Sequence, residues 1–371
     1  MSKTLQDYAT LINDTIQSNE INHYITTDNM CQNLGGIDTF KNINIPQGKV
    51  RSFQKDDVLL SNIRLYFRKV YRAKQKGGCS SDVLVFRAKH IDSATLFAIL
   101  SSQIFTDYAC SGSQGSKMPR GNKTHMMDFK IPTINFTIAK IFNSIQNKIE
   151  NNHKINELLH KILELLYEQY FVRFDFLDEN NKPYQTSGGK MKFSKELNRL
   201  IPNDFEVKTL RELTQLKVGN KNANHSSNQG KYPFFTCSNN PLRCETYQFE
   251  GKHIIISGNG NFYVTHYDGK FDAYQRTYVV NPNNPNHYVL IYLFVKSYTN
   301  YLKLQSRGSI IKFITKSDIE NIKIVLPNLK THAKWNNVLK MIENNNQSTQ
   351  TLTALRDFLL PLLLKQQVKP Q

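Results

Sequence analysis

The sequence repeats a long segment of itself in the same order. Tyr108 corresponds to Tyr301, 193 positions later (301 − 108), and the run IENN at 149–152 returns at 342–345. Solenoid repeats have periods of about 20–50 residues, so a period of this length indicates that a whole module was duplicated. We therefore expect the chain to fold as two similar units related by an approximate two-fold axis.

The front of each copy also matches, with a different offset. The run KTLQDYATL begins at Lys3 and KTLRELTQL begins at Lys208, which is 205 positions later (208 − 3). The second copy is therefore shorter in its middle by 12 positions (205 − 193). Similar ends with different middles are typical of one scaffold carrying two recognition surfaces, although ordinary drift after duplication gives the same pattern. Duplex DNA is the main target that such paired modules meet.

Composition narrows the class of partner. The chain has 371 residues, of which 39% are hydrophobic, enough for packed cores. Its 48 Lys and Arg exceed its 30 Asp and Glu and give a net charge of +18, so we expect a polyanionic partner. Nucleic acid is the first candidate and an anionic membrane surface the second. No run approaches the roughly 18 apolar residues that a membrane-spanning helix needs.

The start of the chain and its cysteines indicate a compartment. MSKTLQDYATLIND is polar and lacks the features of a signal peptide. The five cysteines are odd in number and form no CxxC pair, so free thiols in the cytoplasm are expected. Cys237 and Cys244, with His253 and His266 downstream, fit no standard zinc spacing, and no metal site is predicted.

Hydrophobic periodicity predicts a mixed α/β unit at the front of each copy. The first unit is expected to contain strands at 57–63 and 82–88 and a helix at 92–108, followed by a glycine–serine turn at 111–116. Asp92 or Ser93 is the expected N-cap of that helix. Its expected buried positions are Leu96, Ile99, Leu100 and Ile104. The second unit is expected to repeat this plan, with strands at 231–238, 252–258 and 276–280, a helix at 287–304 and a turn at 306–309.

After Pro132 the apolar residues step by three and four, which predicts a long helix with a heptad seam. The seam consists of Ile138, Phe142, Ile145, Ile149, Asn152, Asn156, Leu159, Leu163, Leu166 and Tyr170. A second seam consists of Trp335, Val338, Ile342, Asn345, Leu352, Leu355, Leu359 and Leu362. Both are polar in the middle, which favours antiparallel pairing of the two helices. Packing of each helix on its own unit is the alternative.

A polar segment with glycines and prolines at 174–207 separates the copies and is interpreted as a linker with a short helix in it. The fold class is therefore α+β: two mixed α/β globules separated by two long antiparallel coiled-coil helices, with a pseudo-two-fold internal repeat. The predicted boundaries are 1–133 and 205–328 for the globules, 134–173 and 329–371 for the helices, and 174–204 for the linker.

Several motifs carry a family resemblance. They are FVRFDFLDENNKPYQTSGGKMKF and IPNDFEVKTLREL around the linker, then YPFFTCS, GKHIIISGNG, FDAYQRTYVV and RGSIIKFITKSDIENIKIVLP. These resemble the central region and the target recognition domains of specificity (S) subunits of type I restriction–modification enzymes. The resemblance covers essentially the whole chain, is strongest over 165–330, and is weakest over the first 90 residues.

This resemblance implies a function. In that family each target recognition domain reads half of a split double-stranded DNA sequence, and the two long helices pair and set the gap. DNA methyltransferase (M) subunits dock around the helices, and restriction/translocase (R) subunits join for cleavage. It implies no catalysis and no cofactor on this chain, whose partners use S-adenosylmethionine, ATP and Mg²⁺.

The run RLYFRKVYRAKQK at 64–76 is rich in basic and aromatic residues and lacks acids, which favours phosphate contacts. Its candidate DNA-binding residues are Arg64, Arg68, Lys69, Arg72, Lys74 and Lys76. The alternative is a solvated basic strand face with Tyr66 or Tyr71 in the core.

Two further groups of residues are candidates for DNA contact. Those near the two matching turns are Gln114, Lys117, Arg120 and Lys123, and Arg307, Lys312 and Lys316. Side chains able to make bidentate contacts to base edges elsewhere in the second module are Asn239, Asn240, Asn259, Asn261, Tyr274, Gln275 and Arg276.

No catalytic motif is evident. SGNGN at 257–261 lacks the following lysine and helix start of a phosphate loop, and NPNNPNHY at 281–288 is not a methyltransferase base-binding loop. Glu250 and Lys252 have the E-x-K spacing of some nucleases, without a well-placed aspartate before them. A stand-alone DNA endonuclease or methyltransferase with a duplicated binding region remains the alternative, and a coiled-coil scaffold is a third reading.

Overall fold

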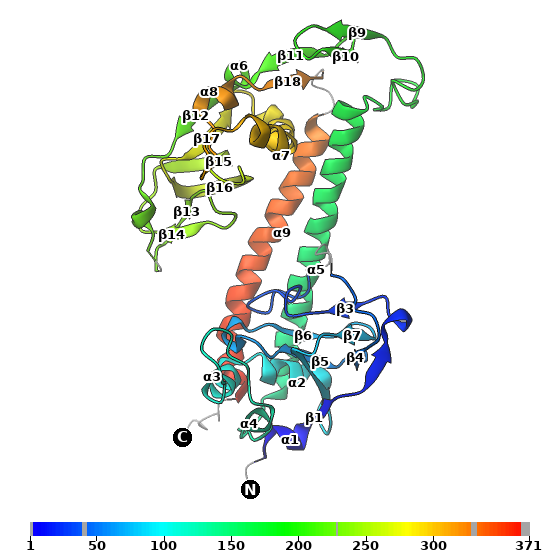
Figure 1. Cartoon of the computed structure of the whole chain (residues 1–371), viewed down its shortest axis with the longest axis vertical. Coiled ribbons are helices and arrows are strands. Elements are labelled where there is room, and N and C mark those ends of the chain that lie inside the picture. Colours follow the sequence, from blue (N-terminus) through cyan, green and yellow to red (C-terminus); the bar gives the residue numbers. More distant parts are fainter. Residues whose placement is uncertain (1–2, 39–42, 228, 328–331, 365–371) are drawn as a thin grey trace. The chain divides into compact units, whose positions relative to one another are not determined.

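The computed structural model describes residues 3–38, 43–227, 229–327 and 332–364. The chain divides into two compact units, Met1–Ile155 with Asn345–Gln371 and Asn156–Asn344. Two long helices, α5 (Phe136–Tyr167) and α9 (His332–Leu359), each contribute one part to each unit (Figure 1). Among the described residues no helix combines the length and the apolar character needed to cross a membrane.

The first unit is built on two four-stranded sheets. One has the order β1-β8-β5-β6 and the other β2-β4-β7-β3. The first sheet comprises β1 (Ala9–Ile12), β8 (Val83–Ala88), β5 (Val58–Ser61) and β6 (Val70–Arg72). The second comprises β2 (Thr15–Gln17), β4 (Lys49–Phe53), β7 (Gly77–Cys79) and β3 (Tyr24–Ile25). The short helices are α1 (Leu5–Tyr8), α2 (Ser93–Leu100), α3 (Gln103–Ser111) and α4 (Lys123–Met127).

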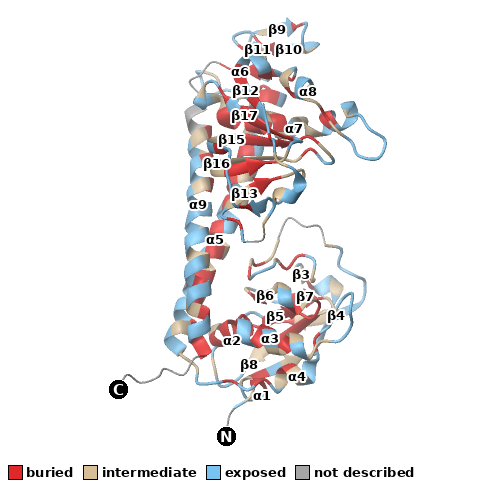
Figure 2. Ribbon diagram, turned by 90° about the vertical axis from the view of Figure 1, so that its left-hand side faces the viewer, coloured by how far each residue is buried: buried red, intermediate tan, exposed pale blue. Residues whose placement is uncertain are grey.

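The second unit is built on one six-stranded sheet of order β12-β17-β15-β16-β13-β14. Its strands are β12 (Thr214–Val218), β17 (Thr277–Pro282), β15 (Phe249–Ser257), β16 (Val264–Ala273), β13 (Tyr232–Phe235) and β14 (Leu242–Cys244). A two-stranded pair joins β11 (Glu206–Thr209) to β18 (Lys323–Leu326). The helices are α6 (Leu210–Leu213), α7 (Tyr288–Gln305) and α8 (Lys316–Glu320). Buried residues concentrate in the sheets and on one side of the helices (Figure 2).

Elements at the two ends of each copy correspond in the structure. Helix α4 and helix α8 begin 193 positions apart, at Lys123 and Lys316. Helices α1 and α6 both open with a capping box, in which the side chains of Thr4 and Asp7, or of Thr209 and Glu212, satisfy backbone N–H groups. The following strands pair alike, β1 with β8 and β12 with β17, both antiparallel. The duplication of a whole module is therefore confirmed.

The single helix expected at 92–108 is wrong in one respect, because it is two helices. Ser102 adopts an extended backbone and its side chain accepts a hydrogen bond from the Phe105 N–H, so it caps a new helix, α3, after α2 has ended. This break changes the face that each helix buries. Leu96, at 0% exposed, lies in the core as expected, whereas Ile104 is 44% exposed.

In the first unit, α5 packs against the C-terminal part of α9. Phe142 is fully buried in the same core as Leu360 and Leu363, which belong to the 3₁₀ turn that follows α9. The Asn152 amide donates to Thr349 Oγ1 across the helix pair at 3.1 Å. The polar residue of α9 that meets Asn152 is therefore Thr349.

The predicted seam of α9 is wrong near its end. Leu355 is 44% exposed and Leu362 is 37% exposed. Arg356 is buried instead, and its Nη1 donates to Gln146 Oε1 at 3.1 Å. An α-helix drifts by about 20° per heptad relative to a strict 3.5-residue repeat, which moves a neighbouring position into the interface.

In the second unit, the other halves of the two helices pack together. Leu159 and Leu163 share a core with Trp335, Leu339 and Ile342. The Asn156 amide donates to the Ile342 carbonyl at 3.3 Å. The late part of α5 therefore meets the early part of α9 here, whereas the reverse holds in the first unit. The helices run antiparallel, as predicted.

The short helix expected in the linker is wrong. Residues 174–204 are all described and contain a β-hairpin formed by β9 (Met191–Ser194) and β10 (Arg199–Pro202). Asn198, in the hairpin turn, has a φ of 51°. This left-handed conformation suits a short polar side chain and interrupts any helix.

Candidate nucleic-acid interface

The same glycine turn follows helix α3 in the first unit and helix α7 in the second. A bridge pairs Gln114 with Arg120 in the first unit and Arg307 with Phe313 in the second, 193 positions later. Gly115 has a φ of 97° and Gly308 a φ of 96°, a left-handed conformation that favours glycine. A Cβ on Gly308 would also lie 2.3 Å from the Ile311 carbonyl oxygen. The turn is therefore an inherited and conformationally defined feature.

The first turn displays polar and basic side chains. Gln114, Lys117, Arg120 and Lys123 are all exposed. The Arg120 guanidinium forms an ion pair with Asp82 at 3.1 Å, but the Arg120 side chain remains 59% exposed. The Arg64 guanidinium donates to the Lys117 carbonyl at 3.3 Å and so supports the turn. The first unit thus brings these predicted residues together on one loop and the start of α4.

The second turn is joined to a second loop of predicted residues. A bridge pairs Asn259 with Phe313, and the Gly260 N–H donates to the Lys312 carbonyl at 2.8 Å. Lys312 and Lys316 are exposed. Arg307 pairs with Asp318 at 3.2 Å and remains 58% exposed. These contacts place the loop at 257–261 beside the turn at 307–313.

Further loops of the second unit reach the same region. The Gly258 N–H donates to the Arg276 carbonyl at 2.7 Å, which ties the loop at 257–261 to the loop at 274–276. The Cys237 thiol lies 3.5 Å from the same carbonyl, so the loop holding Asn239 is close as well. The candidate residues exposed on these loops are Asn239, Asn240, Asn261, Gln275 and Arg276, with Asn259 and Tyr274 half-buried.

The polar atoms of this surface are only partly used within the protein. Asn261 donates to the Tyr263 hydroxyl at 3.0 Å. The carbonyl oxygen of the Asn259 side chain is buried and accepts no hydrogen bond. Amides and guanidiniums presented in this way are the groups that recognise adenine and guanine edges. The second unit therefore holds a surface suited to reading bases, bordered by basic side chains.

The basic run at 64–76 does not form one exposed face. Arg64 and Arg68 have left-handed backbones, with φ of 51° and 49°, on either side of a 3₁₀ turn at Leu65–Phe67. Arg68 donates to the Ser101 carbonyl at 2.9 Å, and its burial lowers the pKa of the guanidinium. Lys69 donates to the Thr27 carbonyl. These two side chains are half-buried and bond to carbonyls of the chain itself.

The remaining basic residues of the run at 64–76 also differ in their contacts and exposure. Lys74 forms an ion pair with Glu150 of α5 at 3.2 Å, and Arg72 lies 3.6 Å from Asp56. Lys76 is exposed. Tyr71 is buried, as the alternative interpretation expected, and Tyr66 is 53% exposed. The six basic side chains therefore do not share one exposed face, because several of them bond to groups within the protein, and their contact with DNA stays a prediction.

Sequence reasoning missed exposed apolar residues at the two turns. Met118 and Ile311 occupy matching positions of the repeat and are 51% and 61% exposed. Ile310, next to them, is 95% exposed. Such side chains can contact the methyl group of thymine in the major groove. In the sequence, only the equivalence of their repeat positions distinguishes these apolar residues from others.

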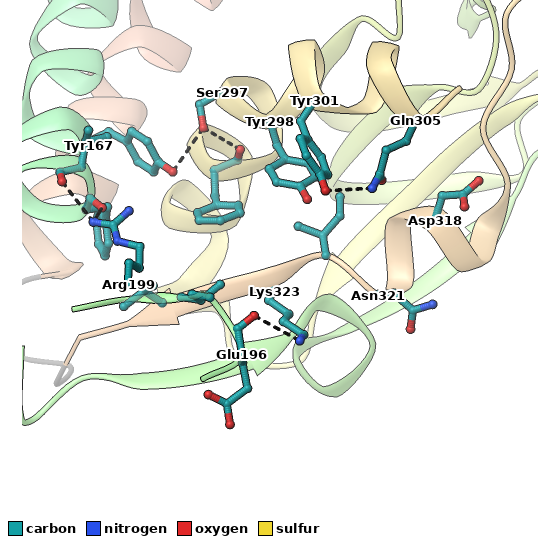
Figure 3. Close-up of a pocket in the computed structure, with 16 residues that line it drawn as sticks. Tyr167, Glu196, Arg199, Ser297, Tyr298, Tyr301, Gln305, Asp318, Asn321 and Lys323 are labelled. Carbon is teal, nitrogen blue, oxygen red and sulfur yellow. Dashed lines mark hydrogen bonds between the residues drawn. The ribbon is translucent and has the colours of Figure 1, made fainter. Parts of the chain in front are cut away.

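A cavity in the second unit could be taken for an active site. It encloses about 620 Å³ between α7, the β9–β10 hairpin and β18, and is lined by Tyr167, Arg199, Tyr298 and Lys323 among others (Figure 3). Its polar groups are already paired: Ser297 donates to the Tyr167 hydroxyl at 3.2 Å and Lys323 donates to the Glu196 carbonyl at 3.3 Å. Burial raises the pKa of Tyr167 to about 12. The lining holds no nucleophile paired with a base.

Comparisons with known proteins show what this chain is similar to. A family model described as the Type I restriction modification DNA specificity domain matches residues 202–355. The chain is 37% identical over 132 residues to the Type I restriction enzyme EcoDI specificity subunit of Escherichia coli, covering 34% of this chain and 28% of the relative. It is 24% identical over 301 residues to the Type I restriction enzyme MjaIX specificity subunit of Methanocaldococcus jannaschii, covering 72% of this chain and 67% of the relative.

A solved structure shares the fold. The S subunit of a type I restriction–modification system from M. genitalium matches with a TM-score of 0.62 and 16% identity, covering 99% of this chain and 96% of that one. The chain spans little more than a quarter of the Escherichia coli relative and two thirds of the archaeal one. The matched domain and the named relatives show that the chain is similar to specificity (S) subunits of type I restriction enzymes, and the solved S subunit shows that it shares their fold.

Proposed function

We propose that this chain selects the double-stranded DNA sequence on which a type I restriction–modification complex acts. The target is bipartite, and each unit reads one half-site. The observation that carries the proposal is the glycine turn built twice, at Gly115 and Gly308, each time beside exposed polar and basic side chains. The net charge of +18 suits a polyanionic target.

The two half-sites differ in sequence. In the second unit the turn adjoins the loops that hold Asn239, Asn259 and Gln275, whereas in the first unit it adjoins Arg64 at the 3₁₀ turn. Different donors and acceptors recognise different base edges. The whole target is therefore asymmetric.

The chain itself catalyses nothing in this proposal. Methyltransferase (M) subunits supply S-adenosylmethionine-dependent methyl transfer, and restriction/translocase (R) subunits supply ATP- and Mg²⁺-dependent cleavage. Support for docking of a partner comes from α5, where Leu158, Ile162 and Leu165 are 60%, 45% and 49% exposed at helical spacing in the second unit. Since its substrate is the host's DNA, the complex works in the cytoplasm.

One experiment separates this function from that of a stand-alone enzyme. Purified chain is incubated with genomic DNA, Mg²⁺ and a labelled methyl donor, with and without the cognate M subunits. We expect no cleavage and no methylation by the chain alone, and methylation at a split target when M subunits are present. Methyl transfer or cleavage by the chain alone would favour the stand-alone enzyme instead.

A further inference from the structure

The six-stranded sheet of the second unit and a 3₁₀ turn beside it bring together three side chains with the donor atoms of a transition-metal site. His225 lies in a 3₁₀ turn at Ala223–His225, Cys244 ends β14 and Asp272 lies in β16. Their Nε2, Sγ and carboxylate oxygen atoms all lie within 4.8 Å of one another. We propose that this cluster binds a Zn²⁺ ion.

The geometry requires little rearrangement. His225 Nε2 lies 3.2 Å from Asp272 Oδ2. In tetrahedral zinc sites, with bonds of about 2.0–2.3 Å, neighbouring ligand atoms are roughly 3.3–3.7 Å apart. The histidine and the carboxylate therefore already have ligand spacing. The thiol, which now lies 3.2 Å from the Thr246 carbonyl, would have to move by about 1 Å to reach the same spacing.

Burial gives an independent reason to expect a cation. Asp272 and Cys244 are both 0% exposed. Asp272 Oδ2 accepts from the Thr246 hydroxyl at 2.7 Å, but Oδ1 is buried without any hydrogen-bond partner. A buried carboxylate oxygen without a partner is costly unless it is paired or coordinates a metal. Bidentate coordination would satisfy Oδ1 and bring the donor atoms from the protein to four.

The donor set selects the metal. A thiolate and an imidazole nitrogen are ligands for Zn²⁺ and are unsuited to Mg²⁺ or Ca²⁺, which take oxygen ligands. The sequence concealed the site because its ligands are separated by 19 positions (244 − 225) and 28 positions (272 − 244). These spacings match no zinc motif, and only the pairing of β13 with β14 and β16 brings the ligands together.

A metal here would support the reading surface. The pairing of β13 is short, with three residue pairs to β14 and two to β16. The loop that holds Asn239 lies between β13 and β14. Zinc bound by a residue from β14, a residue from β16 and the 3₁₀ turn would join this edge of the sheet to its centre. The ion therefore has a structural role in positioning the loop.

The test uses the purified full chain and needs no DNA. Metal content is measured after exhaustive dialysis, and Co²⁺ then replaces Zn²⁺ as a spectroscopic probe. We expect one Zn²⁺ per chain, a thiolate-to-cobalt charge-transfer band, and a melting temperature that rises on adding Zn²⁺. Cys244→Ser should remove the band and weaken Zn²⁺ binding on the order of tenfold or more.

Cys237→Ser is the matched control, because Cys237 belongs to the same unit but not to the cluster. It should retain both the band and the metal. His225→Gln supplies a second variant if Cys244→Ser fails to fold. Absence of stoichiometric metal together with an absent charge-transfer band would overturn the proposal and leave a hydrogen-bonded His225–Asp272 pair only. Equal loss of metal in the Cys237 and Cys244 variants would overturn it as well.

Discussion

The two units share a scaffold and differ in what surrounds the shared turn. In the first unit a second, separate sheet carries β2, β3, β4 and β7, and basic side chains near the turn, such as Arg68, bind the chain's own carbonyls. In the second unit β13 and β14 extend the main sheet, and three loops meet at the turn. Residues at the ends of each copy specify the scaffold, whereas the inserted middle specifies the surface. A protein built this way can change one recognition surface and keep the other.

Exchange of one surface gives the largest expected effect. Residues 209–325 are replaced by the corresponding segment of another specificity subunit. Because the first unit is untouched, we expect one half-site to change completely while the other is kept. Mapping of methylated bases in cells that carry the hybrid measures this. A hybrid that altered both half-sites would break the assignment of one unit to one half-site.

Acid should destabilise the second unit more than the first. Burial first, then His160, Lys252 and Lys296, lower the pKa of His266 to about 4, and this outweighs Glu343, 3.7 Å away. In the unfolded chain the His266 imidazole is protonated as the pH falls through about 6.5, whereas in the folded chain it stays neutral until the pH approaches 4. Stability present above pH 6.5 is therefore lost as pH falls toward 4, by up to about 3 kcal/mol.

Chemical denaturation between pH 7 and 4.5 measures this loss. His266→Gln should flatten the pH dependence of the free energy of unfolding. In the first unit, burial lowers the pKa of His23, and His23→Gln should have a smaller effect. Identical pH profiles for wild type and the His266 variant would show that other groups control the acid sensitivity.

The two turn glycines provide a matched pair. Alanine at Gly308 would meet both an unfavourable φ of 96° and a carbonyl oxygen 2.3 Å from its Cβ. At Gly115 the φ is 97°, but the nearest atom lies 3.7 Å away. We expect Gly115→Ala to cost about 1 kcal/mol and Gly308→Ala about 2–3 kcal/mol in free energy of unfolding. Equal costs would mean that the turns relax alike.

Substitution of exposed basic residues should weaken DNA binding, whereas substitution of a basic residue bonded within the protein should not. Lys117→Ala and Lys312→Ala should each weaken binding to all sequences and reduce the log–log salt slope by about one unit. Lys69→Ala should cost about 1 kcal/mol of stability, through its lost hydrogen bond, and keep the salt slope. Fluorescence anisotropy across a salt series provides the slopes. If Lys69→Ala reduced the log–log salt slope, Lys69 in the basic run at 64–76 would contact DNA after all.

Periodicity and repetition predicted the parts of the fold that depend on local sequence. The duplication, the strands at 57–63 and 252–258, and the two long helices could be found because hydrophobic spacing reflects secondary structure. The division of the basic run could not, since it depends on left-handed backbones at Arg64 and Arg68 and on carbonyls distant in sequence. The same holds for the seam of α9, where helix drift exchanged Leu355 for Arg356.

In the candidate site, too, the features that depend on local sequence could be predicted, and those that depend on contacts distant in sequence could not. The turns at Gly115 and Gly308 were identified because they recur in the sequence, and the residues near them lie on shared loops. The convergence of the loops holding Asn239, Asn259 and Arg276 depends on sheet pairing, which spacing alone does not reveal. The cluster of His225, Cys244 and Asp272 was missed for the same reason.

The central claim is that two units read two different half-sites. Single-base mapping of methylation, in cells that express the native chain with its M subunits, tests this claim most directly. The account predicts a split, asymmetric target; if both units lie on one face of the duplex, the centres of its two half-sites are about one helical turn, roughly 10 base pairs, apart. A continuous or palindromic target would contradict it.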